Sequence, residues 1–544
     1  MQKEHVMSTR RKVRQLIETL SIEEKVGQLF VLAFAGNDVD YAINLVKDYH
    51  VGGFYITDDN AHSAADAKQL SSLLQQQAAL RSCDAPLLLA VDQEGAWGIL
   101  TQETDLGPGN LALGKANDLE QTQAMYQVFA EQMQALGYNT LLSPCADINS
   151  NPNNPIIGQR SFGEQTLEVA QHVDAAVKGV LLTGNLACAK HFPGHGDTAQ
   201  DSHRTLPTVN KSLAQLKEQD LQPFASAINA NVSLIMTAHI NYPQIDPDYP
   251  ATLSKTILTD ILKGQLGFDG LIITDSMNMW AMRHYFSPSE AAILSIKAGA
   301  HLIMLSEEHY ENEATPYKEI QQQTIKGVID AVKTGELSEQ QIDESLQHIL
   351  CFKYRKLVNN QAKDKLTKKR CQQISSEAAA SAIRVLKNKE GLFPLEDKPF
   401  ILACAADPKE YEKLVNSRGI GPNDPHSASS VFIDQLNSQA VNFTLMPFHQ
   451  LIEVLEGNED HKTNTPMVLL TEDYPLPGED FDNQQQTIRV QQAAKIFGNN
   501  LIVLALRSDY ELEHFSEIAH YICAYSSRKD SAKALANALI QIKK

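Results

Sequence analysis

The chain lacks the features that mark membrane-spanning and nucleic-acid-binding proteins. No run approaches the roughly 20 apolar residues of a membrane span, and the N-terminal MQKEHVMSTRRKVRQLIETL has neither the apolar core nor the cleavage site of a signal peptide. The formal net charge of −19 disfavours contact with phosphate backbones and anionic lipid. We expect a cytoplasmic protein with no membrane span and no nucleic-acid partner, or a periplasmic or secreted one if a leader has been removed.

Paired cysteines are also absent. The seven cysteines are odd in number, and no two lie close enough to suggest a metal or redox motif. This weakly favours a reducing compartment, where free thiols act as small hydrophobes. No internal repeat or low-complexity tract is present. At 544 residues the chain exceeds one ordinary domain of about 100–200 residues, so two or three domains are expected.

Short apolar runs recur eight times before residue 307, most of them bounded by Gly, Pro or polar residues. Such runs fit strands buried on both faces of a parallel sheet. Amphipathic helical patterns lie between most of them, and this alternation predicts a (β/α)₈ barrel, an α/β fold. The predicted strands are Gly27–Phe34, Val51–Thr57, Pro86–Val91, Thr140–Pro144, Leu186–Ala189, Ser233–Ala238, Leu271–Thr274 and His301–Leu305.

A second α/β region follows a polar, lysine-rich stretch, Val358–Arg370. We predict a barrel domain over residues 1–357, a linker over 358–377 and a layered C-terminal α/β sandwich domain over 378–544. The predicted strands of the second domain are Phe400–Cys404, Phe443–Pro447, Met467–Thr471, Leu501–Leu506 and Tyr521–Tyr525.

Ionisable residues recur just past the predicted barrel strands. In a barrel these strand ends converge on one face, where active sites are built. Polar residues flank any strand, but the opposite ends carry no matching set of acids and histidines. The residues are Asp92, Asp147, Lys190, His191, His239, Asp275 and Glu307.

The densest group of such residues is the segment KHFPGHGDTAQDSH, Lys190 to His203. One interpretation is a polar surface loop. Another is a metal site, but the histidine spacings of 4 and 8 in a Pro/Gly loop do not match the i, i+4 helical pattern of metal-binding motifs. We therefore expect no metal and no cofactor.

This segment resembles the signature of glycoside hydrolase family 3, in its bacterial β-N-acetylglucosaminidase branch. Four further stretches agree with the family. VDQEG (91–95) looks like its first sugar-binding loop, PIIGQRSFG (155–163) its arginine motif, GFDGLIITDSM (267–277) its nucleophile strand, and AIRVLKNKEGLFPL (382–395) the start of its second domain. The resemblance covers nearly the whole chain.

The resemblance implies a retaining mechanism in which Asp275 is the nucleophile and His203, oriented by Asp201, carries the proton. An imidazole can act as both acid and base near neutral pH. For Asp275 the alternative is an aspartate that caps the next helix. For His203 it is an ordinary surface histidine.

The resemblance also implies that four residues hold the terminal sugar. Asp92 can accept two hydrogen bonds from adjacent hydroxyls, and Arg160, Lys190 and His191 supply donors. For Arg160 the alternative is a structural salt bridge. Trp97 and Leu100 occupy positions where the family pattern has arginines, which leaves the exact sugar open. Trp97 would either stack on a sugar or pack in the core.

The leading hypothesis is an exo-acting β-N-acetylhexosaminidase working on muropeptide sugars in cell-wall recycling or on chito-oligosaccharides. A second hypothesis keeps the covalent step but uses phosphate as the acceptor, and a third is a non-catalytic glycan-binding module. The partner is a carbohydrate, and the chain is expected to be a monomer or homodimer. The second domain could serve stability, dimerisation or as a lid.

Overall fold

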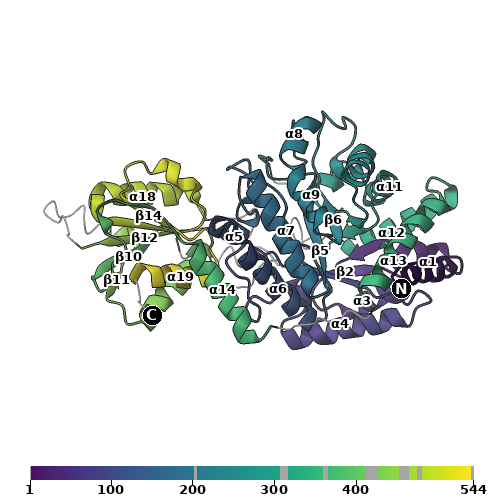
Figure 1. The fold of residues 1–544 in the computed structure, drawn as a ribbon, viewed down its shortest axis with the longest axis horizontal. Helices are drawn as coiled ribbons and strands as arrows, with labels where there is room; N and C mark the ends of the chain where they lie inside the picture. The colour runs from purple at the N-terminus through teal and green to yellow at the C-terminus, as the bar shows by residue number, and fades with distance from the viewer. Residues whose placement is uncertain are drawn as a thin grey trace.

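The computed structural model describes residues 2–200, 205–306, 316–358, 366–407, 409–411, 426–451, 465–473 and 481–540. Figure 1 shows two units side by side, a barrel on the right and a smaller α/β unit on the left. Three residues singled out from the sequence, Asp201, His203 and Glu307, lie outside the described residues. Within the described ranges, no helix combines the length and the apolar character that crossing a membrane requires.

The first unit is a parallel eight-stranded barrel, which confirms the predicted (β/α)₈ fold. The strand order is β7-β6-β5-β4-β3-β2-β1-β8, and a parallel bridge between Ile273 and Leu302 joins its two ends. Each predicted apolar run contains or begins one strand: β1 (Phe30–Leu32), β2 (Gly53–Ile56), β3 (Leu88–Val91), β4 (Thr140–Leu141), β5 (Leu186–Phe192), β6 (Leu234–Thr237), β7 (Leu271–Ile273) and β8 (Ile303–Leu305).

Helices surround this barrel and bury the outer face of every strand, which is why the runs are apolar throughout rather than alternating. They include one π-helix, Thr256–Gln265. The α-helices are α1 (Gln2–Ile17), α2 (Ile22–Gly27), α3 (Val39–Lys47), α4 (Ala64–Ala79), α5 (Asn110–Ala116), α6 (Leu119–Ala135), α7 (Thr166–Leu182), α8 (Leu213–Glu218), α9 (Leu221–Asn229), α10 (Trp280–Arg283), α11 (Pro288–Ala298), α12 (Tyr317–Thr334) and α13 (Glu339–Lys356).

The second unit is a six-stranded sheet in the order β11-β10-β12-β13-β14-β9, flanked by helices. Five strands are parallel and match the predicted runs, whereas β9 (Arg384–Asn388) pairs antiparallel with β14 and was not predicted. Its sequence RVLKN is only partly buried, as suits an edge strand. The other elements are β10 (Phe400–Cys404), β11 (Phe443–Leu445), β12 (Met467–Glu472), β13 (Leu501–Leu506), β14 (His520–Cys523), α14 (Lys368–Ala382), α16 (Ala428–Ser438), α18 (Asn483–Phe497) and α19 (Lys529–Ile540).

The segment between the two units is partly helical. Helix α14 occupies the second half of the expected linker, 358–377, and Cys371, Ile374 and Ala378 bury their side chains in the barrel's hydrophobic core. The domain limits 1–357 and 378–544 therefore stay a proposal. From the barrel side, Leu111 and Ala112 of α5 join the core of the second sheet, and Figure 1 places α5 and α14 at the junction.

Candidate active site

The carboxyl ends of the barrel strands gather the candidate residues. Asp92 directly follows β3, and Asp275 lies two residues beyond β7. Lys190 and His191 lie near the carboxyl end of the long strand β5. Arg160 ends a short 3₁₀ helix, Gly158–Arg160, in the connection after β4. Because parallel strands in a barrel all end at one face, residues far apart in sequence meet there.

Four of these side chains form an ionic cluster of Asp92, Glu94, Arg160 and Lys190. Arg160 donates through Nε and Nη2 to the two carboxylate oxygens of Glu94, each at 2.9 Å. Lys190 Nζ lies 2.6 Å from Glu94 Oε1 and also contacts Asp92 Oδ1. Two acids face two bases, so the cluster is electrically balanced, as a buried ionic group must be.

Burial and charge act in opposite directions on this cluster. Burial by itself raises the pKa of Glu94, but the positive charges of Arg160 and Lys190 outweigh it and hold the pKa well below its ordinary value. Burial likewise lowers the pKa of Lys190, and the negative charges of Asp92 and Glu94 outweigh it and raise the pKa. Glu94, Lys190 and Arg160, whose pKa the neighbouring carboxylates also raise, therefore stay charged at neutral pH.

Asp92 is the least buried member of the cluster. Its side chain is 16% exposed, against 0–9% for the other three. Tyr55, on β2, donates its hydroxyl to Asp92 Oδ2 at 2.7 Å. Asp92 is thus the member of the cluster most open to a ligand, and its carboxylate is held from two sides.

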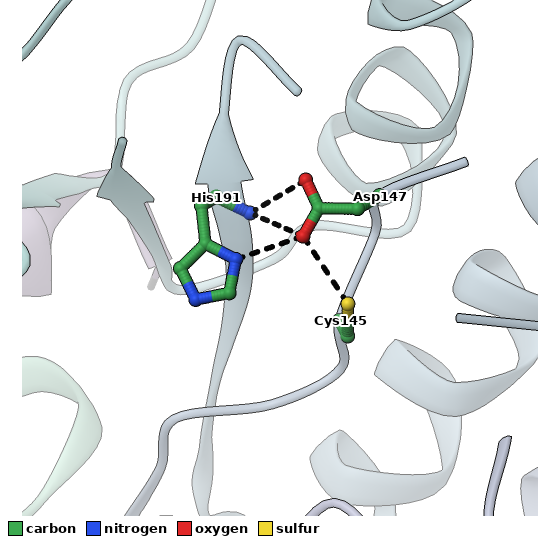
Figure 2. Close-up of side chains that lie close together, drawn as sticks. All are labelled: Cys145, Asp147 and His191. Carbon is green, nitrogen blue, oxygen red and sulfur yellow. Dashed lines mark hydrogen bonds and ion pairs between the residues drawn. The ribbon is translucent and has the colours of Figure 1, made fainter. Parts of the chain in front are cut away.

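His191 is oriented by a second buried acid. Its Nδ1 lies 2.8 Å from Asp147 Oδ2, and Asp147 also accepts the backbone N–H of His191 (3.2 Å) and of His195 (2.6 Å). Figure 2 shows the imidazole of His191 directed at this carboxylate, with Cys145 Sγ approaching the same oxygen, Oδ2. Since the Asp147 carboxylate can only accept, Nδ1 donates to it, and Nε2 faces the cluster, where it lies 3.5 Å from Arg160 Nη2.

Cys145, Asp147 and His191 are also close enough together to hold a metal ion, with one ligand atom from each within 4.8 Å of the others. Each of these atoms already has a hydrogen-bond partner within the group: Cys145 Sγ donates to Asp147 Oδ2 at 3.2 Å, and His191 Nδ1 contacts the same oxygen. Burial and the neighbouring Asp147 raise the pKa of the Cys145 thiol well above its ordinary value. A metal would need the thiolate, so the protonated thiol favours a hydrogen-bonded support for His191.

Asp275 lies at the same end of the barrel as the ionic cluster. Its Oδ1 accepts the backbone N–H of Ser276 at 2.7 Å, which limits the rotation of the carboxylate. Burial raises the pKa of the Cys188 thiol on β5, and the charges of Lys190, Asp92 and Asp275 all act on that thiol. His239 also belongs to this end, with Nε2 2.9 Å from the backbone oxygen of Ser276.

Trp97 and Leu100 are both buried, each 9% exposed. The backbone oxygen of Trp97 accepts the N–H groups of Glu94 (2.7 Å) and Gly95 (3.1 Å), and Leu100 packs into the barrel core. Leu100 therefore acts in packing, and for Trp97 the two expected roles, stacking on a sugar or packing in the core, both stay predictions.

The structure brings Asp92, Arg160, Lys190 and His191 together, as the sequence suggested. The roles of these residues and of Asp275 remain predictions, as do those of Asp201 and His203, which lie outside the described residues. Sequence reasoning missed Glu94 and Tyr55 and gave Asp147 only a minor place. The signal for Glu94 was present, since it stands two residues after Asp92 in the same loop, but its partners follow 66 and 96 positions later.

A parallel eight-stranded barrel with acids and bases gathered at the carboxyl ends of its strands is the usual place of an enzyme active site. The family model for the N-terminal domain of glycosyl hydrolase family 3 matches residues 21–352. This match covers more than half of the chain, and the chain belongs to glycosyl hydrolase family 3.

Individual relatives agree with this assignment. A beta-hexosaminidase A from Pseudoalteromonas piscicida is 33% identical over 376 residues, which cover 65% of this chain and 62% of that protein. A beta-N-acetylglucosaminidase/beta-glucosidase from Cellulomonas fimi is 27% identical over 78% of this chain and 74% of that protein. The solved structure of a family 3 beta-N-acetylglucosaminidase from Paenibacillus sp. str. FPU-7 superposes with a TM-score of 0.82 at 28% identity, over 96% of this chain and 97% of that one.

Proposed function

We propose that this protein is a retaining exo-β-N-acetylhexosaminidase, which removes terminal N-acetylglucosamine from β-linked saccharides. The observation that carries the proposal is the charged, buried cluster around Asp92 at the same barrel face as Asp275, which follows β7. The names of the relatives from Pseudoalteromonas piscicida and Paenibacillus support the choice of sugar. The natural substrates we propose are muropeptide sugars or chito-oligosaccharides.

The proposed sugar site uses the ionic cluster as a rigid base. Asp92 accepts hydrogen bonds from sugar hydroxyls, while Lys190 and Arg160 donate from fixed positions because Glu94 holds both cations. His191 offers Nε2, since Asp147 occupies Nδ1. Side chains that are already in place lose little entropy when the sugar binds, and this favours tight recognition of its hydroxyl pattern.

In the proposed reaction the Asp275 carboxylate attacks the anomeric carbon as the glycosidic C–O bond breaks. His203 donates its proton to the leaving oxygen, and Asp201 supports the imidazolium that it starts from. Water then attacks the glycosyl–aspartate, His203 takes the water proton, and the sugar leaves with its anomeric configuration retained. An acid/base group of this kind contributes about 10²–10⁴-fold to the rate.

The test is a panel of nitrophenyl glycosides. We expect turnover of the N-acetyl-β-glucosaminide, and Asp275→Ala should abolish it. A 2-deoxy-2-fluoro glycosyl fluoride should label Asp275 in the wild type only, because the carboxylate bonds to the anomeric carbon as the anomeric fluoride leaves. Turnover that persists in Asp275→Ala would contradict the mechanism. A glucoside preferred over the N-acetylglucosaminide would contradict the sugar. Sugar-1-phosphate formed only with added phosphate would point to phosphorolysis, and no turnover of any glycoside would point to a binding module.

A further inference from the structure

The loop that carries Arg160 is held at its base by the second domain. This arginine loop, residues 149–164, is closed by a hydrogen bond from the Asn149 N–H to the Gly163 oxygen (3.0 Å). Tyr510, which follows β13 in the second domain, donates its hydroxyl to Glu164 Oε1 at 2.5 Å. The same hydroxyl accepts a hydrogen bond from Asn149 Nδ2 at 2.8 Å. One side chain of the second domain therefore joins both ends of the arginine loop.

The second domain also holds this loop near its functional residue. Gln159, next to Arg160 in the chain, donates through Nε2 to Asp473 Oδ2 at 2.8 Å. Asp473 follows β12 and forms an ion pair with Arg507 Nη2 at 2.7 Å, so the acceptor is itself fixed. Arg507 follows β13 and is largely buried. The contact is thus made by an anchored charge at a strand end.

The neighbouring sugar loop, residues 92–101, is held in the same way. Arg528 donates to the backbone oxygen of Ala96, and Lys529 Nζ donates to that of Thr101 at 2.9 Å. Both cations stand shortly after β14, where the sequence runs into α19. The backbone oxygens that they bind lie within seven residues of Glu94.

These two loops supply the two halves of the Glu94–Arg160 pair, which closes only if both loops are correctly placed. The carboxyl ends of β12, β13 and β14 therefore face the active-site loops of the barrel. In parallel α/β sheets this edge is the one that commonly carries function. The contacts between this edge and the barrel loops are charged or hydrogen-bonded. The contact of Leu111 and Ala112, which also joins the two units, is apolar.

We propose that the second domain positions the sugar site, with Tyr510 as the positioning residue that fixes the arginine loop and so sets the place of Arg160. The inference rests on the proposed function for the identity of the sugar. Tyr510 has no direct contact with Asp92, Glu94 or Lys190 among its hydrogen bonds, so its effect passes through the loop. A purely structural role would alter stability but leave the kinetics of the folded protein unchanged.

The first experiment is hydrogen exchange, which needs no substrate. Tyr510→Phe keeps the ring and removes the hydroxyl that joins Asn149 and Glu164. We expect faster exchange of the backbone amides of residues 149–164 than in the wild type. Two matched controls should leave that loop unchanged. Tyr411→Phe removes a hydroxyl bound to the His426 oxygen within the second domain, and Ser381→Ala removes a contact to Gln121 away from the loop. Unchanged exchange in Tyr510→Phe would overturn the inference.

The second experiment measures kinetics on whichever aryl glycoside the wild type hydrolyses. We expect Tyr510→Phe to lower kcat/KM on the order of tenfold, mainly through KM, because hydrogen bonds to a charged group are lost. Gln159→Ala, which loosens the same loop from the barrel side, should act in the same direction and serves if Tyr510→Phe folds poorly. Faster loop exchange with unchanged kcat/KM in both variants would refute the positioning role.

A double-mutant cycle separates positioning from stability. If Tyr510 acts through Arg160, its substitution should cost less than about twofold in an Arg160→Lys background, because the effects of coupled residues are not additive. A full tenfold loss in that background would overturn the inference. A wild type that hydrolyses no glycoside would refute the proposed function alone, and the exchange experiment would still decide the loop contact.

Discussion

At the residue scale, two buried acids, Glu94 and Asp147, hold the side chains of the proposed sugar site in place. Glu94 is fully buried and holds both Arg160 and Lys190, and Asp147 holds His191. Without these partners, the side chains of Arg160, Lys190 and His191 would have several rotamers and would each lose entropy on binding. A site of this design recognises a sugar by geometry set in advance.

Asp147→Asn should impair the site although Asp147 need not touch the sugar. The amide keeps one acceptor oxygen, so its NH₂ group would oppose either the backbone N–H groups of His191 and His195 or the Nδ1–H of His191. We expect kcat/KM to fall about 10- to 100-fold, the loss typical of hydrogen bonds to a charged group. Steady-state kinetics on a nitrophenyl glycoside measures this. Cys145→Ala is the control and should change kcat/KM less than threefold, or about 0.7 kcal/mol, since a thiol donates weakly.

The ionisation of Asp147 also gives this prediction a pH window. Burial acts to raise its pKa, but the charge and hydrogen bond of His191 outweigh it and lower the pKa to about 2 from 3.8. The carboxylate therefore adds stability above pH 3.8 that is lost as pH falls through about 2. Across a normal assay range Asp147 stays ionised, so the wild-type-to-Asn ratio of kcat/KM should not track its titration. A ratio that collapses near pH 5 would contradict this assignment.

Lys353 should make stability depend on pH. It is fully buried on α13, donates to the Gly52 oxygen at 2.6 Å, and burial lowers its pKa to about 7 from 10.5. Between pH 7 and 10.5 the unfolded state binds more protons, so the free energy of unfolding rises with pH in that window. Lys353→Met should remove this rise, and its stability relative to wild type should be at least about 1.4 kcal/mol more favourable at pH 6 than at pH 10.

Urea unfolding from pH 6 to 10 measures this difference. Lys356→Met, on the exposed side of the same helix, is the matched control and should leave the pH dependence as in the wild type. Parallel curves for Lys353→Met and wild type would show that Lys353 is charged in the folded state and would contradict the prediction.

At the scale of elements, close packing fixes the backbone of the loop that follows β5. A Cβ on Gly196 would lie 1.6 Å from the backbone oxygen of Ile148, so no larger residue fits without moving the loop. Tyr242 donates its hydroxyl to the Gly194 oxygen from the other side. These contacts, rather than sequence-local preferences, set the path of the backbone at Gly194 and Gly196.

Gly196→Ala should therefore displace this loop. We expect a loss of about 1–3 kcal/mol in the free energy of unfolding, the usual cost of overpacking, together with lower kcat/KM. Gly264→Ala is the matched control, because that glycine is exposed and its nearest neighbour would be 3.4 Å from the new Cβ. Denaturant unfolding and steady-state kinetics on both variants measure the effect. Equal stability of the two variants would contradict the packing argument.

At the scale of the whole molecule, the two units share a hydrophobic core. Leu111 and Ala112 of α5 pack with residues of the second sheet such as Val503 and Tyr521. Unfolding of the second sheet would expose this part of the barrel to water, so the two units should unfold together.

Leu111→Ala should weaken this coupling. Leu111 is 0% exposed, and removing a fully buried leucine side chain costs about 2–5 kcal/mol. We expect calorimetry to show one main transition in the wild type and two separated transitions in Leu111→Ala. Leu80→Ala, at a leucine that is 80% exposed, should keep the wild-type profile. A single transition at the wild-type temperature in Leu111→Ala would contradict the shared core.

Most of the fold could be predicted from the sequence because barrel strands are short, apolar and separated by helices. The edge strand β9 could not, since RVLKN is polar enough to resemble a loop and becomes a strand only by pairing with β14. The helical second half of the expected linker was missed for a similar reason. Its lysines face water, while Cys371 and Ile374 are buried only because the barrel lies beside them.

The sequence by itself determined the family motifs, the strands and the residues at the strand ends, because these depend on local chemistry and on periodicity. Only the tertiary structure decided their partners. Arg160 meets Glu94 across 66 positions, and Tyr510 meets Glu164 across 346. Such contacts depend on barrel closure and on the docking of the second sheet. No periodic pattern in the sequence marks residues that are far apart along the chain and meet only in the folded protein.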